Sequence, residues 1–477
     1  MADLVVRNGR VVTPSGVILG GLAVDGEIIT YIGADSELPK AQRVIDAGGN
    51  LVIPGLIDSH VHLTAAPKPF MEQYRFAFPM ETDGAIHGGV TTFGEFLSGL
   101  DFNTGTQRPL SQVAPEVIEI GNQCSRVDFF FHGIVAGQET VEEMPMLARE
   151  YGIYSYKHFF NSYKAKPGEA ALLPSTENDQ LFKSLRQIAA IGEPAVGMGH
   201  CEDQDIAWVL EDQLKAQGRN DLLAWTEHRP NWAEEMRMQM AFNIAKAAGA
   251  PFYCVHMASA EGPDIIKQLR SEGYVAWGET CPHYLTHTGD MEEQIGVWGK
   301  VNTTLKTTRD IDRLWRGIVD GSVTNMGTDH CPWPKAAKEN GGGKHNNIWN
   351  AMPGINGGME HWLPVMMTFG VNPGRISIED MVRVCSTNNA KVWGLYPKKG
   401  VLAPGSDADI VLVDPDKEAT IDENFYHCMA DWGIYFGWKV RGMARTTIVR
   451  GNVMMEDYKT VGEPGIGKYQ PCGPAGR

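Results

Sequence analysis

The feature that most constrains this chain is a repeated alternation of short apolar runs with longer helical stretches between residues 53 and 397. The runs are rich in β-branched and aromatic residues, as strands are: GVTTFGEF, VDFFFHGIV, IYSYKHFF, AVGMGH, PFYCVHM, YVAWGET and VTNMGTDH. Repeated strand, helix, strand units imply a parallel sheet with both faces covered. About eight such units close most simply into a barrel. We therefore predict an α/β fold, a (β/α)8 TIM-like barrel.

Both ends of the chain carry shorter β-rich segments. Asn8-Gly9 in LVVRNGRVV and Asp25-Gly26 in GLAVDGEIITYIG lie between strand-like runs, which is typical of hairpin turns. Near the other end, GSDADIVLVD and ARTTIVRGNVMME predict further strands. Neither end is large enough to fold alone. We expect residues 1–52 and 398–450 to form one small β-sandwich domain beside the barrel of residues 53–397.

Three other segments carry local signals. WAEEMRMQMAFNIAKAA predicts a helix that opens at Asn231 as N-cap and closes at Gly249. The glycines and asparagines of residues 338–350 predict a mobile loop, which is either a lid or a plain surface loop. Residues 451–477 form a C-terminal tail, either an arm that contacts a neighbouring subunit or a frayed end.

Composition excludes several classes of protein. The chain is 43% hydrophobic and 21% charged, which is typical of a globular protein. Its net charge of -16 and its lack of a basic run argue against a nucleic-acid partner. The first residues show no signal-peptide pattern, and no apolar stretch approaches the roughly 18 residues of a membrane span. We expect a cytoplasmic protein with no membrane partner, whose eight cysteines stay free because none forms a CxxC pair.

Histidines follow several of the predicted strands. His60 and His62 in IDSHVHL are two residues apart, so on a strand both point to one face, where two imidazoles suit a divalent metal. Core packing explains this spacing equally well. His200, His256 and Asp329 end later runs, and in a barrel the carboxyl ends of strands share one face. Together these residues favour a metal centre over structural histidines.

Lys157 is the most unusual residue in a predicted strand, GIYSYKHFF. An ammonium group in an apolar strand is unfavourable unless it is paired, neutral or chemically modified. Alternatively, its long stem reaches the end of the strand, where the charge meets water. The residues alone leave both interpretations open.

Motifs spread over nearly the whole chain resemble the dihydropyrimidinase, hydantoinase and allantoinase branch of the amidohydrolase superfamily. They are IPGLIDSHVHL, GIYSYKHFF, GETCPHYL, GTDHCPW, STNNAKVWGLYPKKGVLAPGSDADIVL and TIVRGNVMMED. The resemblance implies a hydrolase that opens a cyclic amide, such as a dihydropyrimidine, a hydantoin or a related cyclic ureide or imide. It also implies two divalent metal ions, of which zinc best suits imidazole and carboxylate ligands.

The same resemblance assigns roles to the candidate residues. Lys157 would carry a carbamate, as N6-carboxylysine, that bridges the two metals. His60, His62 and Asp329 would bind the first metal, and His200 and His256 the second. A hydroxide held between the metals would attack the ring carbonyl, and Asp329 would act as general base and then general acid.

Substrate contacts are implied for four further positions. Leu63 stands where dihydroorotases typically have an arginine, which argues against dihydroorotate. Tyr163 comes one residue later than the substrate-holding tyrosine of related enzymes, and Asn302 and Asn356 match other substrate-contacting positions. These departures leave the identity of the ring open.

Three alternatives follow from these motifs. An allantoinase, or a hydrolase of an unusual cyclic amide or lactam, would use the same framework. A non-catalytic scaffold relative would lack several of the six metal-ligand candidates, whereas all six are present. Relatives are often tetramers, so the resemblance implies a homotetramer or homodimer that acts on a small molecule.

Overall fold

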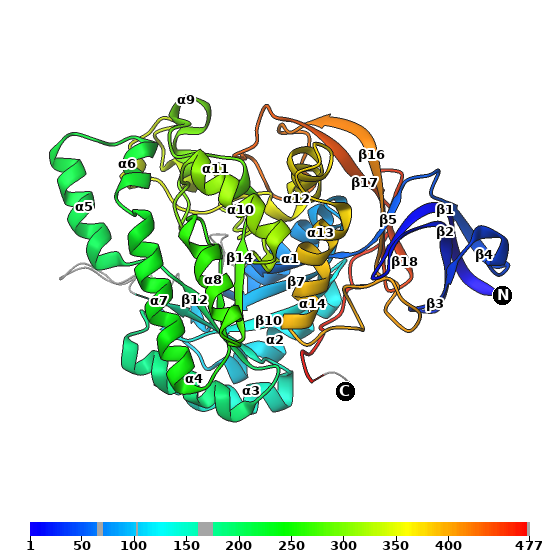
Figure 1. Cartoon of the computed structure of the whole chain (residues 1–477), viewed down its shortest axis with the longest axis horizontal. Helices are drawn as coiled ribbons and strands as arrows, with labels where there is room; N and C mark the ends of the chain where they lie inside the picture. Colours follow the sequence, from blue (N-terminus) through cyan, green and yellow to red (C-terminus); the bar gives the residue numbers. More distant parts are fainter. Residues whose placement is uncertain (64–69, 102–103, 161–174, 475–477) are drawn as a thin grey trace.

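The computed structural model of the chain describes residues 1–63, 70–101, 104–160 and 175–474. An eight-stranded parallel barrel surrounded by helices makes up most of the molecule, and a separate sheet lies at one side of it (Figure 1). In that sheet, strands from the start of the chain lie beside strands from its end. The predicted fold class is confirmed.

Eight strands form the barrel in the spatial order β15-β14-β13-β12-β11-β10-β7-β6, with every neighbouring pair parallel. Their bounds are β6 Leu56–Val61, β7 Val90–Leu97, β10 Asp128–Ile134, β11 Ser155–Phe159, β12 Val196–His200, β13 Phe252–Cys254, β14 Ala276–Thr280 and β15 Asn325–Met326. A parallel bridge between Val61 and His330 joins the two ends of this order. Almost all of these residues are buried because helices cover the outer face of the barrel.

The helices lie outside the barrel (Figure 1). Their bounds are α1 Phe70–His87, α2 Leu110–Cys124, α3 Gln138–Tyr151, α4 Asn178–Ile191, α5 Gln204–Ala216, α6 Leu222–Glu227, α7 Asn231–Ala248, α8 Glu261–Ser271, α9 Glu292–Ile295, α10 Thr308–Asp320, α11 Lys335–Glu339, α12 Gly358–Met366, α13 Ile378–Val382 and α14 Asn388–Val392. A short hairpin, β8 Leu100–Asp101 with β9 Thr106–Gln107, follows β7. No helix within the described ranges is long and apolar enough to cross a bilayer.

Helix α7 confirms one predicted boundary and corrects the other. Gly249 ends the helix in the left-handed conformation, at φ 76°. The prediction of Asn231 as N-cap is wrong, because Pro230 holds the cap position and Asn231 is the first helical residue. The Asn231 side chain instead donates to Glu261 and Asp310 on neighbouring helices, at 3.0 and 2.7 Å.

Nine strands from both chain ends form the second sheet, in the order β19-β18-β17-β16-β5-β1-β2-β3, with β4 paired to β1. Their bounds are β1 Ala2–Thr13, β2 Gly16–Asp25, β3 Ile28–Gly33, β4 Ala41–Asp46, β5 Leu51–Pro54, β16 Ile410–Thr420, β17 Lys439–Val449, β18 Asn452–Glu456 and β19 Lys459–Thr460. One apolar core contains side chains from both ends, among them Val6, Val52 and Ile410. The second sheet and its core therefore need strands from both ends of the chain.

The two predicted hairpins differ in outcome. Asp25 pairs with Ile28, so a hairpin does form at this site, with Gly26 and Glu27 as its two turn residues. The hairpin predicted at Asn8-Gly9 is wrong, because both residues lie inside β1, where the register shifts as in a β-bulge. Asn8 adopts a positive φ of 56°, so the Asn-Gly pair serves a bulge instead of a turn.

The C-terminal segment returns to the barrel of its own chain. Phe129 exchanges backbone hydrogen bonds with Lys468 and Gln470, at 3.1 and 2.7 Å, and Cys472 donates to Gly152 at 3.1 Å. Residues 338–350 also make defined contacts, since Lys344 accepts a hydrogen bond from the Val297 amide at 2.8 Å. All eight cysteines are free.

Candidate metal centre

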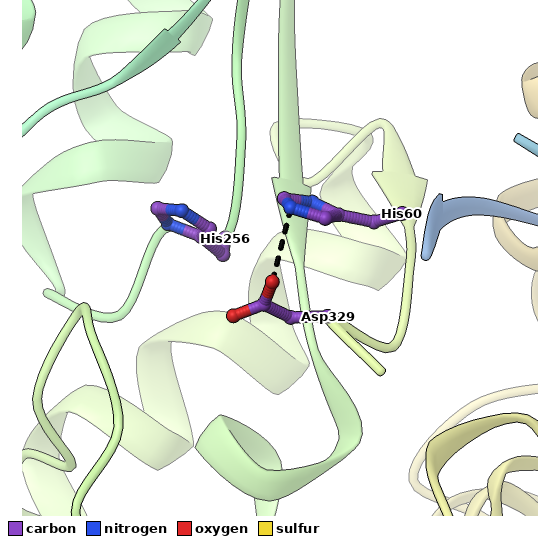
Figure 2. Close-up of side chains that lie close together, drawn as sticks. All are labelled: His60, His256 and Asp329. Carbon is purple, nitrogen blue, oxygen red and sulfur yellow. Dashed lines mark ion pairs between the residues drawn. The ribbon is translucent and has the colours of Figure 1, made fainter. Parts of the chain in front are cut away.

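The structure brings together the six residues that the sequence and its family resemblance single out as metal ligands. Five lie at or just after the carboxyl ends of barrel strands, and Lys157 lies in the middle of β11. Two groups of contacts are visible. His60 Nε2 and His62 Nε2 lie 3.1 and 3.4 Å from Asp329 Oδ1. His200 Nδ1 lies 2.8 Å from His256 Nε2. Figure 2 shows His60, His256 and Asp329 converging on one point.

Lys157 lies on β11, within the same group. Its side chain is fully buried, and Nζ has no hydrogen-bond partner among the described residues. Nζ lies 4.7 Å from the centroid of the Phe96 ring and 5.1 Å from that of Phe159. Burial lowers the pKa of Lys157 to about 8, so a larger share of the amine is unprotonated near neutral pH than for an ordinary lysine.

Glu279, at the end of β14, orients His60. Its Oε1 accepts hydrogen bonds from His60 Nδ1 at 2.6 Å and from the His256 backbone amide at 3.1 Å. Its Oε2 accepts from Tyr253 at 2.8 Å and from Ser59 at 3.3 Å. Since His60 Nδ1 is used in this way, Nε2 is the nitrogen that faces the centre.

In His200 and His256 too, the ring nitrogen that faces away from the centre has a polar partner. His200 Nε2 donates to Glu202 Oε2 at 2.8 Å, and Glu202 is in turn paired with Arg229 at 2.7 Å. His256 Nδ1 lies 3.3 Å from Thr303 Oγ1. Histidines that bind metals almost always give their second ring nitrogen to such a group. The arrangement therefore fits a metal, with His200 Nδ1 and His256 Nε2 as the donor atoms.

Electrostatics prepare these groups to bind a cation. Burial lowers the pKa of His62 to about 4 and holds that of His256 well below its usual range. Burial alone would raise the pKa of Asp329, but His60 and His62 hold it well below its ordinary value. Near neutral pH His62 and His256 thus offer unprotonated imidazole nitrogens and Asp329 offers an ionised carboxylate, the ligand types that suit a divalent transition metal. Burial alone would lower the pKa of His60, but Glu279 and Asp329 outweigh this effect and raise it.

Backbone strain marks two of the candidate ligands. His256 and Asp329 have positive φ values of 39° and 54°. Such values are uncommon outside glycine and cost free energy, so they persist where the surrounding structure enforces them. In both residues the strained backbone directs the side chain toward the centre.

The predicted substrate contacts have different environments. Asn302 Oδ1 is buried and has no partner among the described residues. The side chain of Asn356 is already engaged by the backbones of Trp333 and Gly357. Leu63 is buried, and its amide donates to Glu95 at 2.9 Å. Tyr163 lies outside the described residues.

Sequence reasoning missed Glu279, Glu202 and Thr303. Glu279 stands at the end of the apolar run YVAWGET and is fully buried, so it is as unusual a strand residue as Lys157. That signal was available in the sequence. Glu202 and Thr303 carry no local signal, since both stand in polar segments.

Comparison with known proteins supports one assignment. A profile of the amidohydrolase family matches residues 224–454. The chain is 31% identical to an L-hydantoinase of Paenarthrobacter aurescens and 32% identical to a D-hydantoinase of Ralstonia pickettii, each over 98% of both chains.

Solved structures give the same result. The L-hydantoinase (dihydropyrimidinase) from Arthrobacter aurescens superposes with a TM-score of 0.89 at 30% identity, over 98% of this chain and 99% of that one. A dihydropyrimidinase from Brevibacillus agri gives 0.87 at 28% identity, over 100% of both chains. With the fold and the site described above, these similarities show that the chain belongs to the amidohydrolase superfamily, in its hydantoinase and dihydropyrimidinase family.

Proposed function

We propose that this protein hydrolyses the ring amide of a dihydropyrimidine, a hydantoin or a related cyclic ureide or imide. The observation that carries the proposal is the convergence of His60, His62 and Asp329 with His200 and His256 around the buried Lys157 amine. Relatives that match 98% of the chain are named hydantoinases, which supports the same reaction class.

Membership of the superfamily implies a divalent metal centre. We propose two zinc ions, one held by His60, His62 and Asp329 and the other by His200 and His256. Lys157, carboxylated by carbon dioxide, would supply a shared anion between them. When bound, such a pair would make water acidic enough to ionise near neutral pH and would polarise a carbonyl.

The chain's own residues would handle the proton and the ring. Asp329 is ionised near neutral pH, so its carboxylate can take a proton from the attacking water and return it to the leaving ring nitrogen. Asn302 Oδ1 has no partner among the described residues, so it can accept a hydrogen bond from a ring N–H. Leu63 and Tyr163 would shape the pocket, and Asn356 would contribute through its backbone.

Ring opening is the direct test. Dihydrouracil, substituted hydantoins, allantoin and cyclic imides would be offered to zinc-loaded protein and to its Asp329→Asn variant. We expect the zinc-loaded protein to open one class of ring. In the variant kcat should fall about 10²- to 10⁴-fold, because the amide that replaces the carboxylate cannot accept and return the proton. Asp312→Asn, on the exposed face of α10, is the matched control and should retain full activity.

The outcomes separate the alternatives. Turnover restricted to allantoin would identify an allantoinase. Silence across the panel with two metals bound would point to an unusual cyclic amide or lactam. Silence without bound metal would contradict the proposal and favour a non-catalytic scaffold. An Asp329→Asn variant with full activity would remove Asp329 from the proton-transfer role.

Lys157 gives a second test. Lys157→Ala should bind less metal, because the shared anion is lost, and a short carboxylic acid such as acetate or propionate should restore part of the metal and the activity. Metal content per chain, measured by plasma mass spectrometry, is the readout. Lys183→Ala, at an exposed position of α4, is the control. Full metal content in Lys157→Ala without added acid would contradict the bridging role.

A further inference from the structure

Lys338 is a buried lysine without a carboxylate partner among the described residues. It lies on α11, its side chain is fully buried, and its Nζ donates to two backbone carbonyls, those of Lys300 at 2.7 Å and Gly354 at 3.0 Å. The Trp432 ring lies 4.7 Å from Nζ. The amine therefore cross-links two loops that are far apart in sequence.

A second contact tightens the same cross-link. The Gly354 amide donates to the Lys300 carbonyl at 3.1 Å, so this carbonyl accepts from both the Lys338 amine and the facing loop. The Lys300 side chain is also buried, and its Nζ donates to Ile348 and Trp349 carbonyls at 2.7 and 3.2 Å. We call the Lys338 amine and the Lys300 and Gly354 carbonyls the lysine clamp.

Each loop held by the lysine clamp leads to the metal centre. Asn302 comes two residues after Lys300, and its buried Oδ1 has no partner within the part of the chain that the structure describes. Thr303 follows it and contacts His256 Nδ1. One residue after Gly354, Ile355 accepts a hydrogen bond from Cys331 at 2.7 Å, two residues after Asp329. The clamp therefore lies between the segment that carries Asn302 and the segment that carries Asp329.

We propose that Lys338 is a positioning residue that sets the distance between Asn302 and Asp329 and so determines how tightly the substrate ring is held. A buried amine is unfavourable unless its hydrogens are bonded, and here both bonds go to loops that border the site. Burial also lowers the pKa of Lys338 well below its ordinary value, but either protonation state has the two N–H donors that the clamp requires. The inference rests on the proposed function, since it concerns the same ring.

The test replaces Lys338 by Met, which keeps an unbranched apolar stem, one atom shorter, and removes the donors. We expect KM for the ring amide to rise about tenfold or more, with kcat within threefold of wild type and full metal content. Lys335→Met on the same helix removes an exposed amine that lies 5.5 Å from the Trp298 ring, and it should leave both constants unchanged. A Lys338→Met variant with wild-type KM would overturn the inference.

A double variant separates positioning from a general loss of stability. If Lys338 acts through Asn302, adding Lys338→Met to Asn302→Ala should change kcat/KM by less than threefold, because the affected contact is already absent. Multiplicative effects of the two substitutions would overturn the inference.

Hydrogen exchange provides a readout that needs no substrate. Backbone amides of residues 300–304 and 352–356 should exchange faster in Lys338→Met than in wild type or Lys335→Met, and unchanged exchange would overturn the clamp. If Lys338→Met does not fold, Lys338→Gln takes its place in both measurements. Its nitrogen is carried on a stem one atom shorter and its side-chain oxygen is an acceptor beside the two carbonyls, so the same rise in KM and the same faster exchange are expected. Wild-type protein that opens no ring would overturn the proposed function, whereas an altered exchange pattern would still identify the clamp.

Discussion

Glu279 shows how a single side chain organises this site. It accepts from the second nitrogen of His60 and from the backbone of His256, which belong to opposite metal sites in the proposed assignment. Tyr253 and Ser59 donate to its other oxygen, so the carboxylate cannot rotate without losing several hydrogen bonds. Its position fixes the direction in which His60 presents Nε2.

Removal of this carboxylate should weaken metal binding. Glu279→Gln keeps the shape but removes the charge that stabilises the His60 Nδ1–H, so we expect metal affinity to fall about 10- to 100-fold. Competition with a chelator, followed by metal analysis, measures the change. Tyr253→Phe deletes one donor to Glu279 and should have a smaller effect. Equal affinity in Glu279→Gln and wild type would show that His60 is oriented without it.

At the scale of elements, α1 and α12 and the segment after β16 meet at a histidine pair. The rings of His87 and His427 stack with centroids 3.4 Å apart. His427 Nδ1 donates to Glu360 on α12 at 2.6 Å, and His87 Nε2 bonds with Thr460 on β19 at 3.0 Å. This contact joins the barrel helices to the edge of the second sheet.

The pair predicts a pH dependence of stability. Burial, together with His427 and Arg126, lowers the pKa of His87 to about 3. The unfolded chain therefore binds a proton between pH 6.5 and 3 that the folded chain does not, so the contribution of His87 is present above pH 6.5 and is lost on acidification. Hydrogen bonding to Glu360 raises the pKa of His427. Its contribution to the free energy of unfolding is therefore present in full below pH 6.5 and is lost as the pH rises through the folded-state pKa.

His87→Gln should make the free energy of unfolding less dependent on pH. Between pH 6.5 and 5 we expect the slope to be shallower by up to about 1.4 kcal/mol per pH unit. Urea unfolding of the zinc-loaded protein at several pH values gives the slope. His345→Gln serves as a control, since its side chain is 55% exposed. Parallel slopes for wild type and His87→Gln would contradict the prediction.

At the scale of the whole molecule, a buried charge cluster joins the barrel to the second sheet. Lys399 Nζ lies 2.7 Å from Asp128 at the start of β10, 2.7 Å from Asp409 before β16, and 3.0 Å from Asp407. Arg450, after β17, pairs with Asp128 at 3.0 Å. Burial alone would lower the pKa of Lys399, but the three carboxylates raise it, so the amine stays charged.

Lys399→Met should destabilise the whole chain. The substitution leaves buried carboxylates without their shared cation, and breaking a buried ion pair in this way costs about 3 to 5 kcal/mol. We expect a lower midpoint of thermal unfolding with metal content per folded chain unchanged. Lys398→Met is the control, because the Lys398 side chain is 57% exposed. A Lys399→Met midpoint equal to that of Lys398→Met would contradict this role.

The sequence by itself determined the order of strands and helices and the six candidate metal ligands. Apolar periodicity and the boundary at Gly249 are local properties, so they can be read without the fold, and strand-end residues converge in any barrel. His60 and His200 could be named for this reason, whereas Lys157 was named as a ligand only through the resemblance to the hydantoinase branch. Local signals gave wrong predictions at two positions. The Asn231 side chain bonds with acids on other helices instead of capping its own, and Asn8 lies in a bulge instead of a turn.

Only the tertiary structure decided which groups support the site. Glu279 lies 219 residues from His60, and Lys338 lies 38 residues from the carbonyl that it holds. The run YVAWGET marks Glu279 as unusual, but nothing local names its partner, because a hydrogen bond depends on distance and direction in space. The sequence thus determined which residues reach the mouth of the barrel, whereas packing decided which of their atoms face the centre.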